Sequence, residues 1–368
     1  MTAFEAYMRR AIELAEQARG DTHPNPRVGA VVVEGGEIVA EGFHARAGTP
    51  HAERVALRAL GRKPKPGATL VVTLEPCSTH GRTGACTEAI LDAGIARVVV
   101  GATDPNPAHA GRGLELLRER GVEVIAGVLE RECEALNPIF NYNIVRKSPL
   151  LAAKCALTPD GKMFFVPGER SQITGADARE NVMRERCYFP AIATSSGTVL
   201  CDNPSLTVRL PGEAIRCPMR FVFDRRGRTL ACAERLNVFS DEFREKTILV
   251  TTPETAERAR ARLTASGVCV WELPPEPSAF WVAFRTRCNE SGITGVYFEC
   301  GPAFLRGLFA AEQADYLYAY VAGTPEKSPE KYFSETAVFV PDAHKSFPNG
   351  DSEYCGKIRQ TQHPGTGM

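Results

Sequence analysis

The 368-residue chain has no excess of charge of either sign, because 44 lysines and arginines balance 44 aspartates and glutamates. It also lacks clusters of basic residues with interleaved aromatic residues, the usual surface for holding nucleic acid. No apolar run reaches the length of about 18 residues that suggests a membrane span. Residues 1–10 contain no apolar segment of a secretory signal. We therefore expect a cytoplasmic protein that binds neither nucleic acid nor a membrane.

A disulfide framework is not expected either, although the chain has 12 cysteines. The cysteines are scattered and no secretory signal accompanies them, so the compartment is expected to be reducing. Cys77 and Cys86 are better interpreted as metal ligands. The other ten show no paired metal-ligand spacing and are expected mostly to fill the core. A G-x-G-x-x-G motif after a strand is also missing, which argues against a Rossmann nucleotide site.

One constellation that is present carries recognisable chemistry. His51 and Glu53 form an H-x-E motif, and Cys77 follows a proline, with Cys86 further along the chain. These are the parts of the zinc deaminase signature, H-x-E with P-C-x-x-C. The spacing departs from that signature, because the third position after Cys77 is His80 and residues 78–85 separate the two cysteines.

Hydrolytic deamination explains why these residue types are needed. Zinc held by three protein ligands keeps one position for water and lowers the pKa of that water to about 7. His51, Cys77 and Cys86 are the candidate ligands, and Glu53 is the candidate proton carrier between water, ring nitrogen and leaving ammonia. A structural zinc site would instead be closed by four ligands, with His80 as the fourth. Taken singly, the histidine could be a capping residue and each cysteine a small core residue.

Length suggests two domains. Apolar segments at 28–33, 37–42, 68–74, 96–101 and 122–126 alternate with helical patterns, which predicts a three-layer α/β/α domain over residues 1–147. A second α/β domain is expected over residues 148–368, with residues 137–147 as a junction. Beyond residue 324 the chain becomes polar and weakly periodic, and about the last dozen residues are expected to be disordered.

Four runs in the first half resemble the bifunctional riboflavin-biosynthesis deaminase–reductase family. They read HPNPRVG at 23–29, GFHARAG at 42–48, EPCSTHGRT at 75–83 and DPNP at 104–107, and the wide cysteine spacing is also characteristic of that family. The resemblance implies a cytidine-deaminase-like domain. Its substrate would be 2,5-diamino-6-ribosylamino-4(3H)-pyrimidinone 5′-phosphate, a small phosphorylated pyrimidine. The implied substrate-binding residues are Asn25, His44, His80, Arg82, Asp104 and Asn106.

The second half is similar to the family's NADPH-dependent reductase, which has a dihydrofolate-reductase-like α/β fold and reduces the ribose to a ribityl chain. Matching runs are SSGTVLCDNP at 195–204 and ECGP at 299–302. The implied substrate-binding residues are Arg186, Leu206, Arg209 and Glu299. The implied NADPH-binding residues are Lys154, Ala156, Gln172, Thr198, Asp202, Gly301, Pro302, Ala303, Phe304, Leu305, Arg306 and Gly307. We further expect a homo-oligomer.

Departures from the family pattern keep a second interpretation open. Gln172 stands where the family commonly has tryptophan, and Pro159 and Arg225 also depart from it. The segment after residue 321 lacks the family's usual final strands. The alternative is therefore a monofunctional deaminase with a catalytically impaired reductase-like domain. A deaminase that edits nucleic acid is a third interpretation, and the balanced charge argues against it.

Overall fold

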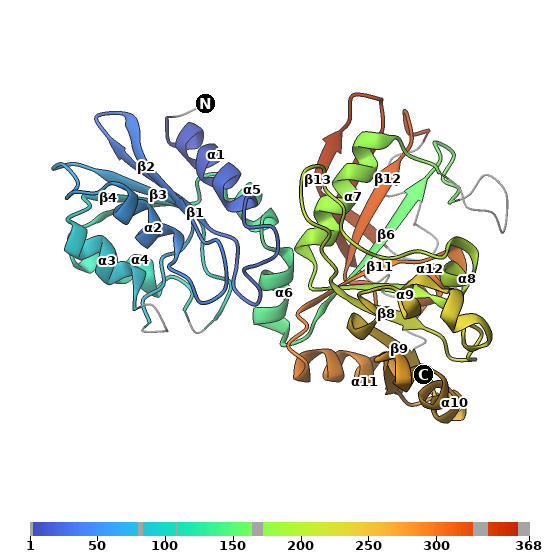
Figure 1. Ribbon diagram of the computed structural model, residues 1–368. Helices are drawn as coiled ribbons and strands as arrows, with labels where there is room; N and C mark the ends of the chain where they lie inside the picture. The colour runs from blue at the N-terminus through green and yellow to red at the C-terminus, as the bar shows by residue number, and fades with distance from the viewer. Residues whose placement is uncertain (1–2, 80–83, 108, 164–171, 327–337, 360–368) are drawn as a thin grey trace, which may run out of the picture. The chain divides into compact units, whose positions relative to one another are not determined.

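The computed structural model describes residues 3–79, 84–107, 109–163, 172–326 and 338–359. The chain divides into two compact units, Met1–Lys147 and Ser148–Met368 (Figure 1). In the part of the chain that is described, no helix is both long and apolar enough to cross a membrane.

The N-terminal unit contains one five-stranded sheet in the order β2-β1-β3-β4-β5. Its strands are β1 (Gly29–Glu34), β2 (Glu37–Phe43), β3 (Thr69–Leu74), β4 (Arg97–Ala102) and β5 (Glu123–Ala126). β1 runs antiparallel to both β2 and β3, whereas β3, β4 and β5 are parallel to one another. Every residue of β1 and of β3 is buried. Such continuous burial indicates a sheet that is covered on both faces.

The helices of this unit lie on both faces of the sheet, and two glycines show why they pack so closely. The helices are α1 (Ala3–Glu16), α2 (Ala52–Ala59), α3 (Cys86–Ala93), α4 (Arg112–Glu119), α5 (Glu130–Ala135) and α6 (Pro138–Arg146). A Cβ at Gly29 would stand 1.9 Å from the carbonyl oxygen of Ala11 in α1, and one at Gly42 would stand 2.4 Å from the nitrogen of Ala56 in α2. Because Gly29 pairs with Phe43, the neighbour of Gly42, the two glycines point to opposite faces. The three-layer α/β/α prediction is therefore confirmed, although residues 138–146 form a helix within the expected junction.

The C-terminal unit contains a nine-stranded sheet in the order β10-β9-β8-β7-β11-β6-β12-β14-β13. Its strands are β6 (Leu150–Leu157), β7 (Ala191–Ser195), β8 (Met219–Phe223), β9 (Thr247–Thr251), β10 (Cys269–Glu272), β11 (Gly295–Glu299), β12 (Tyr316–Val321), β13 (Val338–Ser346) and β14 (Ser352–Arg359). Neighbours from β10 to β12 in this order are parallel, and β14 is antiparallel to both of its neighbours. The carboxyl ends of β7, β11 and β6 therefore meet at one edge of the sheet.

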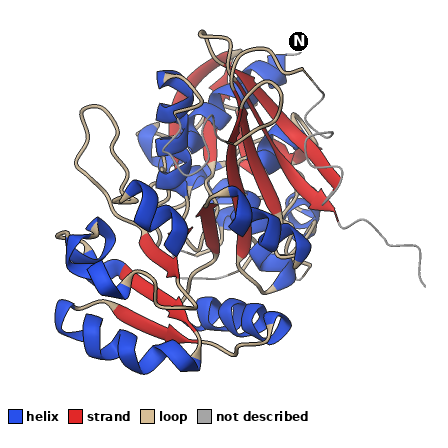
Figure 2. Cartoon of the chain, turned by 90° about the vertical axis from the view of Figure 1, so that its right-hand side faces the viewer, coloured by secondary structure: helices blue, strands red, loops and turns tan. Residues whose placement is uncertain are grey.

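Helices cover both faces of this second sheet as well (Figure 2). They are α7 (Ala176–Tyr188), α8 (Ser196–Asp202), α9 (Asn237–Ser240), α10 (Pro253–Leu263), α11 (Pro277–Glu290) and α12 (Pro302–Ala310). Along β8, Phe221 and Phe223 pack with Phe284 of α11, whereas Val222 packs in a separate cluster with Val199 of α8 and residues of α10. This alternation gives the α/β arrangement that the sequence predicts for the second domain.

The polar segment after residue 324 differs from the sequence-based expectation, because β13 and β14 form an antiparallel pair that extends the sheet. The pair is fixed to the rest of the unit by Asp351. Its carboxylate accepts backbone hydrogen bonds from Gly175 at 2.6 Å and from Gly323 at 3.0 Å. The polar sequence conceals these strands because few of their side chains are buried. Residues 357–359, within the stretch expected to be disordered, belong to β14, and residues 360–368 lie outside the described residues.

Candidate functional site

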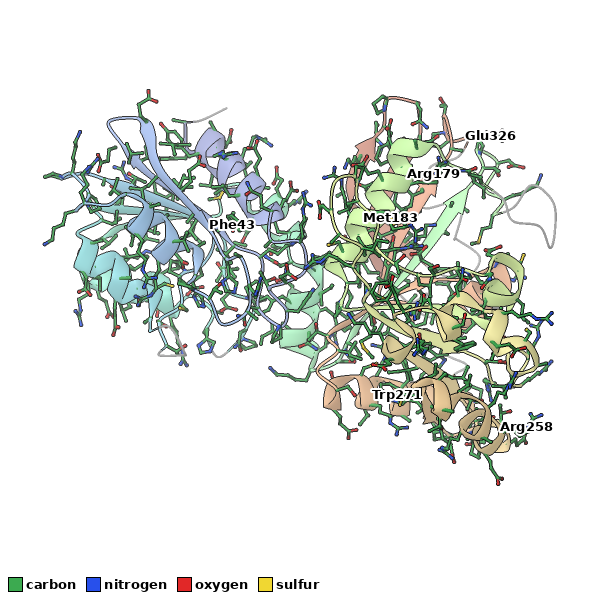
Figure 3. The ribbon with its side chains drawn as sticks, viewed as in Figure 1. Phe43, Arg179, Met183, Arg258, Trp271 and Glu326 are labelled. Carbon is green, nitrogen blue, oxygen red and sulfur yellow. The ribbon has the colours of Figure 1, made fainter. Side chains whose placement is uncertain are left out.

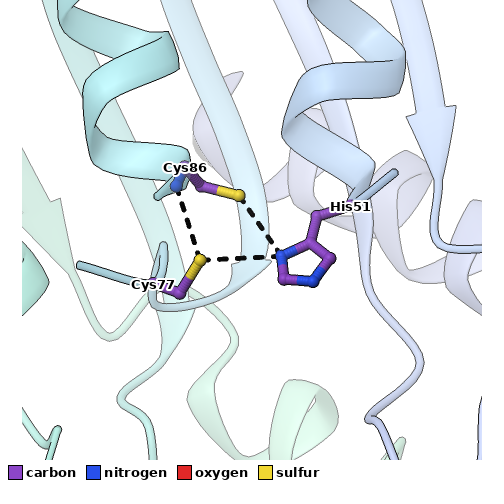
Figure 4. Close-up of side chains that lie close together, drawn as sticks. All are labelled: His51, Cys77 and Cys86. Carbon is purple, nitrogen blue, oxygen red and sulfur yellow. Dashed lines mark hydrogen bonds between the residues drawn. The ribbon is translucent and has the colours of Figure 1, made fainter. Parts of the chain in front are cut away.

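His51, Cys77 and Cys86 come from three separate elements and converge on one point (Figure 4). His51 is the residue that precedes α2, Cys77 lies in the loop after β3, and Cys86 is the first residue of α3. The Nδ1 atom of His51 lies 3.6 Å from Sγ of Cys77 and 3.3 Å from Sγ of Cys86. All three ligand atoms lie within 4.8 Å of one another. The backbone N–H of Cys86 also donates to Sγ of Cys77 at 3.4 Å, which fixes the two cysteine segments together.

The chemistry of these three donors fits zinc. One imidazole and two thiolates form a ligand set that is known for catalytic zinc with one open position. The hydrogen bond from the Cys86 side chain and, to a smaller extent, the one from His51 lower the pKa of the Cys77 thiol to about 4. The same contact with Cys77 raises the pKa of Cys86. The cluster thus has one thiolate already favoured, and a divalent cation would displace the proton of the other.

Glu53 lies in the first turn of α2, and its residue is only 3% exposed. Burial raises the pKa of its carboxyl group, and the nearby Cys77 and Cys86 interact with it electrostatically. A buried carboxyl group beside a three-ligand cluster has the position required of a proton carrier.

Asn25 and His44 form one side of this site, and their hydrogen bonds fix the state of the imidazole. The ring of His44 is buried and lies 5.3 Å, centroid to centroid, from the ring of His51. Because the carbonyl of Pro50 can only accept, Nδ1 of His44 is the donor at 3.2 Å, and Nε2 accepts from the Asn25 amide at 3.3 Å. Burial lowers the pKa of His44, which favours this neutral form. Both ring nitrogens are thus used within the chain, which orients the Asn25 amide.

Of the four remaining residues implied for the pyrimidine substrate, the structure describes Asp104 and Asn106. Asp104 and Asn106 lie in the loop between β4 and α4, where the carboxylate of Asp104 accepts from the backbone N–H of Asn106 at 2.9 Å. The backbone N–H of Asp104 donates to Glu75, the residue after β3, at 3.1 Å. This places the loop close to the Cys77 segment. His80 and Arg82 lie outside the described residues.

In the C-terminal unit, three of the implied residues gather around a fourth, Glu299, at the end of β11. Arg186 of α7 donates to both carboxylate oxygens of Glu299, and also to the Thr207 carbonyl at 2.9 Å. Lys154 stands beside Glu299 in the register of β6 and β11. Burial raises the pKa of Glu299, but Arg186, with Lys154 and Arg209, lowers it more, so the net pKa lies below the usual range. An ionised carboxylate is therefore held among three cations.

A second meeting point joins the implied cofactor residues Thr198 and Gly301. The hydroxyl of Thr198 accepts from the backbone N–H of Gly301 at 3.1 Å. Thr198 itself lies in α8, whose first turn is capped by the Ser195 hydroxyl, which accepts from the Thr198 N–H at 3.3 Å. The start of α12 is thus fixed beside α8. Helix α12 follows β11 and helix α8 follows β7, so both begin at the edge where ligands bind in open α/β sheets.

The other residues implied for the reductase differ in which of their atoms can contact a ligand. Leu206 and Leu305 direct their side chains into the core, so only their backbones remain for a ligand, whereas Phe304 is only partly buried against the core. Leu206 also has a positive φ of 51°, which is unusual for a residue with a Cβ. Gln172 is exposed, and the segment that follows it is fixed to α7 by Arg179 (Figure 3), which donates to the Thr174 carbonyl at 2.6 Å. The others in this group, Ala156, Asp202, Pro302, Ala303, Arg306 and Gly307, lie on β6, α8 and α12.

Two polar residues that hold backbone segments together had no role predicted from the sequence. Glu75 accepts three backbone hydrogen bonds behind the Cys77 segment, and Asp351 anchors the β13–β14 pair. Glu75 is part of a run quoted for its resemblance, so an acidic residue at the end of a fully buried strand was the available signal. Asp351 gives no comparable signal, because its segment has no clear periodicity.

Comparison with known proteins covers both units. Residues 1–102 match the family described as the cytidine and deoxycytidylate deaminase zinc-binding region, and residues 149–324 match the RibD C-terminal domain. The riboflavin biosynthesis protein RibD of Escherichia coli strain K12 is 39% identical over 329 residues, which cover 86% of this chain and 87% of that protein. The RibD of Synechocystis is 46% identical over 331 residues, 89% of this chain and 83% of that protein. For RibD of Actinobacillus pleuropneumoniae the match is 49% over 223 residues, 61% of this chain and 58% of that protein.

Solved structures agree with the sequence matches. The diaminohydroxyphosphoribosylaminopyrimidine deaminase/5-amino-6-(5-phosphoribosylamino)uracil reductase of Thermotoga maritima has 32% identity and a TM-score of 0.77, covering 97% of this chain and 99% of that one. Form 1 of Acinetobacter baumannii RibD has 30% identity and a TM-score of 0.76 over the same shares. The chain therefore belongs to the RibD family of riboflavin-biosynthesis proteins, in which a zinc-binding deaminase domain is joined to an NADPH-dependent reductase domain.

Proposed function

We propose that the N-terminal unit deaminates 2,5-diamino-6-ribosylamino-4(3H)-pyrimidinone 5′-phosphate and that the C-terminal unit then reduces its ribose to a ribityl chain with NADPH. The observation that carries this proposal is the convergence of the ligand atoms of His51, Cys77 and Cys86 within 4.8 Å, with the buried Glu53 in the first turn of the helix that follows His51. The activities in the name of the Thermotoga maritima protein support the choice of substrate.

The proposed deaminase chemistry assigns a separate task to each residue. Zinc held by His51, Cys77 and Cys86 would supply Lewis-acid chemistry that lowers the pKa of water to about 7. Glu53 carries two protons in turn. It moves one from the attacking water to the ring nitrogen, and then a second from the added hydroxyl group to the amino group that leaves as ammonia. Asn25, oriented by His44, presents its amide oxygen to the edge of the ring. Asp104 and Asn106 meet the ribose.

The proposed reductase chemistry relies on positioning, because the hydride comes from the cofactor. The start of α12 can present the Ala303 N–H and the positive end of the helix dipole to a cofactor phosphate, and the contact between Thr198 and Gly301 fixes the direction of the helix. The cations Lys154, Arg186 and Arg209 around Glu299 favour the phosphorylated substrate.

The ligand assignment is tested with two cysteine variants of the N-terminal unit. Cys86→Ser removes one proposed ligand, and Cys133→Ser changes a buried cysteine that packs against Gly101 instead. Metal analysis and ammonia release should show that Cys86→Ser loses zinc and deamination together, whereas Cys133→Ser keeps both. Full zinc content in Cys86→Ser would remove Cys86 from the ligand set.

We also propose that the chain acts in the cytoplasm as a homo-oligomer on this small molecule, without nucleic acid or a membrane. The balance of 44 basic and 44 acidic residues supports the absence of a nucleic-acid surface. Light scattering on the purified chain tests the assembly, and a monomer at working concentration would contradict it.

A further inference from the structure

Glu75 lies between the end of β3 and the ligand Cys77. Its backbone N–H donates to the Ala102 carbonyl at 2.9 Å, which continues the pairing of β3 with β4 by one residue. The residue is only 6% exposed. Its main chain is therefore fixed to the central strands of the sheet, and its carboxylate is available for partners within the unit.

Those partners are three backbone N–H groups of one loop and the helix after it. One carboxylate oxygen accepts from Asp104 at 3.1 Å and from Gly111 at 2.9 Å, and the other accepts from Gly113 at 2.8 Å. The donors lie at both ends of the loop that carries Asp104 and Asn106, and in the first turn of α4. Hydrogen bonds to an ionised carboxylate are stronger than neutral ones, so these three hold the loop closed at both ends.

Gly113 shows how closely the loop and the Cys77 segment approach each other. A Cβ at Gly113 would stand 2.2 Å from the carbonyl oxygen of Pro76 and 3.1 Å from Oε1 of Glu75. Only a glycine fits at this distance without displacing the backbone of the residue before the zinc ligand. The loop is thus placed relative to Cys77 by a backbone contact and by the Glu75 carboxylate together.

We propose that Glu75 is a positioning residue of the deaminase, which fixes the Asp104–Asn106 turn relative to Cys77. It acts through that turn and touches neither substrate nor metal. This proposal rests on the proposed function, in which the turn meets the ribose of the substrate. Small displacements of a binding group are sufficient to weaken binding strongly, so the effect of losing Glu75 should appear mainly in KM for the pyrimidine.

The variant Glu75→Gln keeps the volume of the side chain and replaces one of its two acceptor oxygens with an amide group. A glutamine has one acceptor oxygen, and its amide N–H₂ would face a backbone donor, so at least one of the three hydrogen bonds is lost. Glu34→Gln is the matched control. Glu34 is also buried, at 7% exposure, and accepts from the Lys65 backbone N–H at 2.9 Å and from Arg62. It lies at the opposite end of the sheet, next to the start of β3 in the pairing of β1 with β3.

The test combines deamination kinetics, metal analysis and hydrogen exchange. Glu75→Gln should keep zinc and raise KM for the diaminopyrimidine phosphate about tenfold, as expected for lost hydrogen bonds to a charged group, with a much smaller change in kcat. Amide exchange should become faster across residues 104–113. Gly113→Ala, which leaves Glu75 intact, should raise KM in the same way, whereas Glu34→Gln should leave both KM and this exchange unchanged.

The proposal is overturned if KM in Glu75→Gln stays at the value of Glu34→Gln, or if exchange across residues 104–113 does not change. Loss of zinc in Glu75→Gln would also overturn it, because Glu75 would then hold the ligand Cys77 and not the turn. If the wild-type chain itself releases no ammonia, the proposed function fails. The exchange measurement would in that case still show whether Glu75 fixes the loop.

Discussion

The proton-carrier role proposed for Glu53 rests on its position, because Glu53 is buried in the first turn of α2, beside the three zinc-ligand candidates. Another glutamate of the same unit also lies two residues after a ligand candidate, but its environment is different. Glu88 also follows a ligand candidate, Cys86, by two residues, but its side chain is exposed. Spacing alone therefore does not define the proton carrier, and burial beside the thiols does.

Glu53→Gln should keep the fold and the zinc but lower the deamination rate by about 10²–10⁴-fold, the usual contribution of a general acid–base group. Glu88→Gln is the matched control and should deaminate at the wild-type rate. Ammonia release and metal content are measured for both variants. Near wild-type turnover in Glu53→Gln would remove it from the role of proton carrier.

Arg209→Ala should abolish reduction, because Arg209 is one of the cations near Glu299 that are proposed to bind the phosphorylated substrate. Deamination should stay intact, because the zinc-ligand candidates lie in the other unit. Arg260→Ala, which removes an exposed arginine paired with Glu272 in the same unit, should keep both activities. Oxidation of NADPH with the deaminated pyrimidine gives the readout. Unchanged NADPH oxidation in Arg209→Ala would exclude it from substrate binding.

Sequence and structure give different information at the residue scale. The convergence of His51, Cys77 and Cys86 could be predicted because histidine and cysteine in that order have few other reasons to occur together. The contacts of Glu75 could not, because its three partners are backbone N–H groups, which any residue type except proline supplies. The same holds for the contact between Thr198 and the Gly301 N–H.

Among the elements, α7 shows most clearly where sequence patterns fail. Two of its buried residues, Asn181 and Arg186, are polar, because they face the Tyr320 hydroxyl and the Glu299 carboxylate. A helix whose buried face is partly polar shows no apolar periodicity, so the sequence gives no prediction of it. Strands β1, β3 and β6 were predictable because most of their residues are apolar, with Lys154 inside β6 and Glu34 at the end of β1 as their charged residues.

Asp351 should stabilise the C-terminal unit by holding the β13–β14 pair to Gly175 and Gly323. Burial raises the pKa of its carboxyl group, but the backbone hydrogen bonds from Gly175 and Gly323 and the one from Asn349 lower it further, so the net pKa lies below the ordinary value of 3.8. Asp351→Asn should therefore lower the free energy of unfolding by about 1–3 kcal/mol near neutral pH. Because the pKa is lowered by folding, this stabilisation is complete above pH 3.8 and is lost as pH falls through the folded pKa.

Urea unfolding followed by tryptophan fluorescence measures this difference. Both tryptophans of the chain, Trp271 and Trp281, belong to the C-terminal unit, so the signal reports on that unit alone. Equal unfolding midpoints near neutral pH, or a difference that grows as the pH falls, would contradict the role of Asp351. Asn349→Ala, which removes a weaker partner of the same carboxylate at 2.9 Å, should have a smaller effect.

For the whole molecule, the two units carry consecutive steps on one chain. The residues proposed for the deaminase site lie within Met1–Lys147, and those proposed for the reductase site lie within Ser148–Met368. The combination of a deaminase and a reductase on one chain could be predicted only from the resemblance to a known family. No sequence motif of the second half identifies a nucleotide site by chemistry alone. Gln172, Pro159 and Arg225 depart from the family pattern, and the chain still keeps the cations around Glu299 and the contact of Thr198 with Gly301.

The central claim is tested most directly by incubating the wild-type chain with the diaminopyrimidine phosphate, with and without NADPH, and identifying products by mass. Without NADPH, the account predicts one product in which oxygen replaces the ring amino group, together with released ammonia. With NADPH, that product should gain a hydride and a proton while NADPH is oxidised. Absence of ammonia would contradict the deaminase assignment, and ammonia release without any NADPH oxidation would contradict an active reductase.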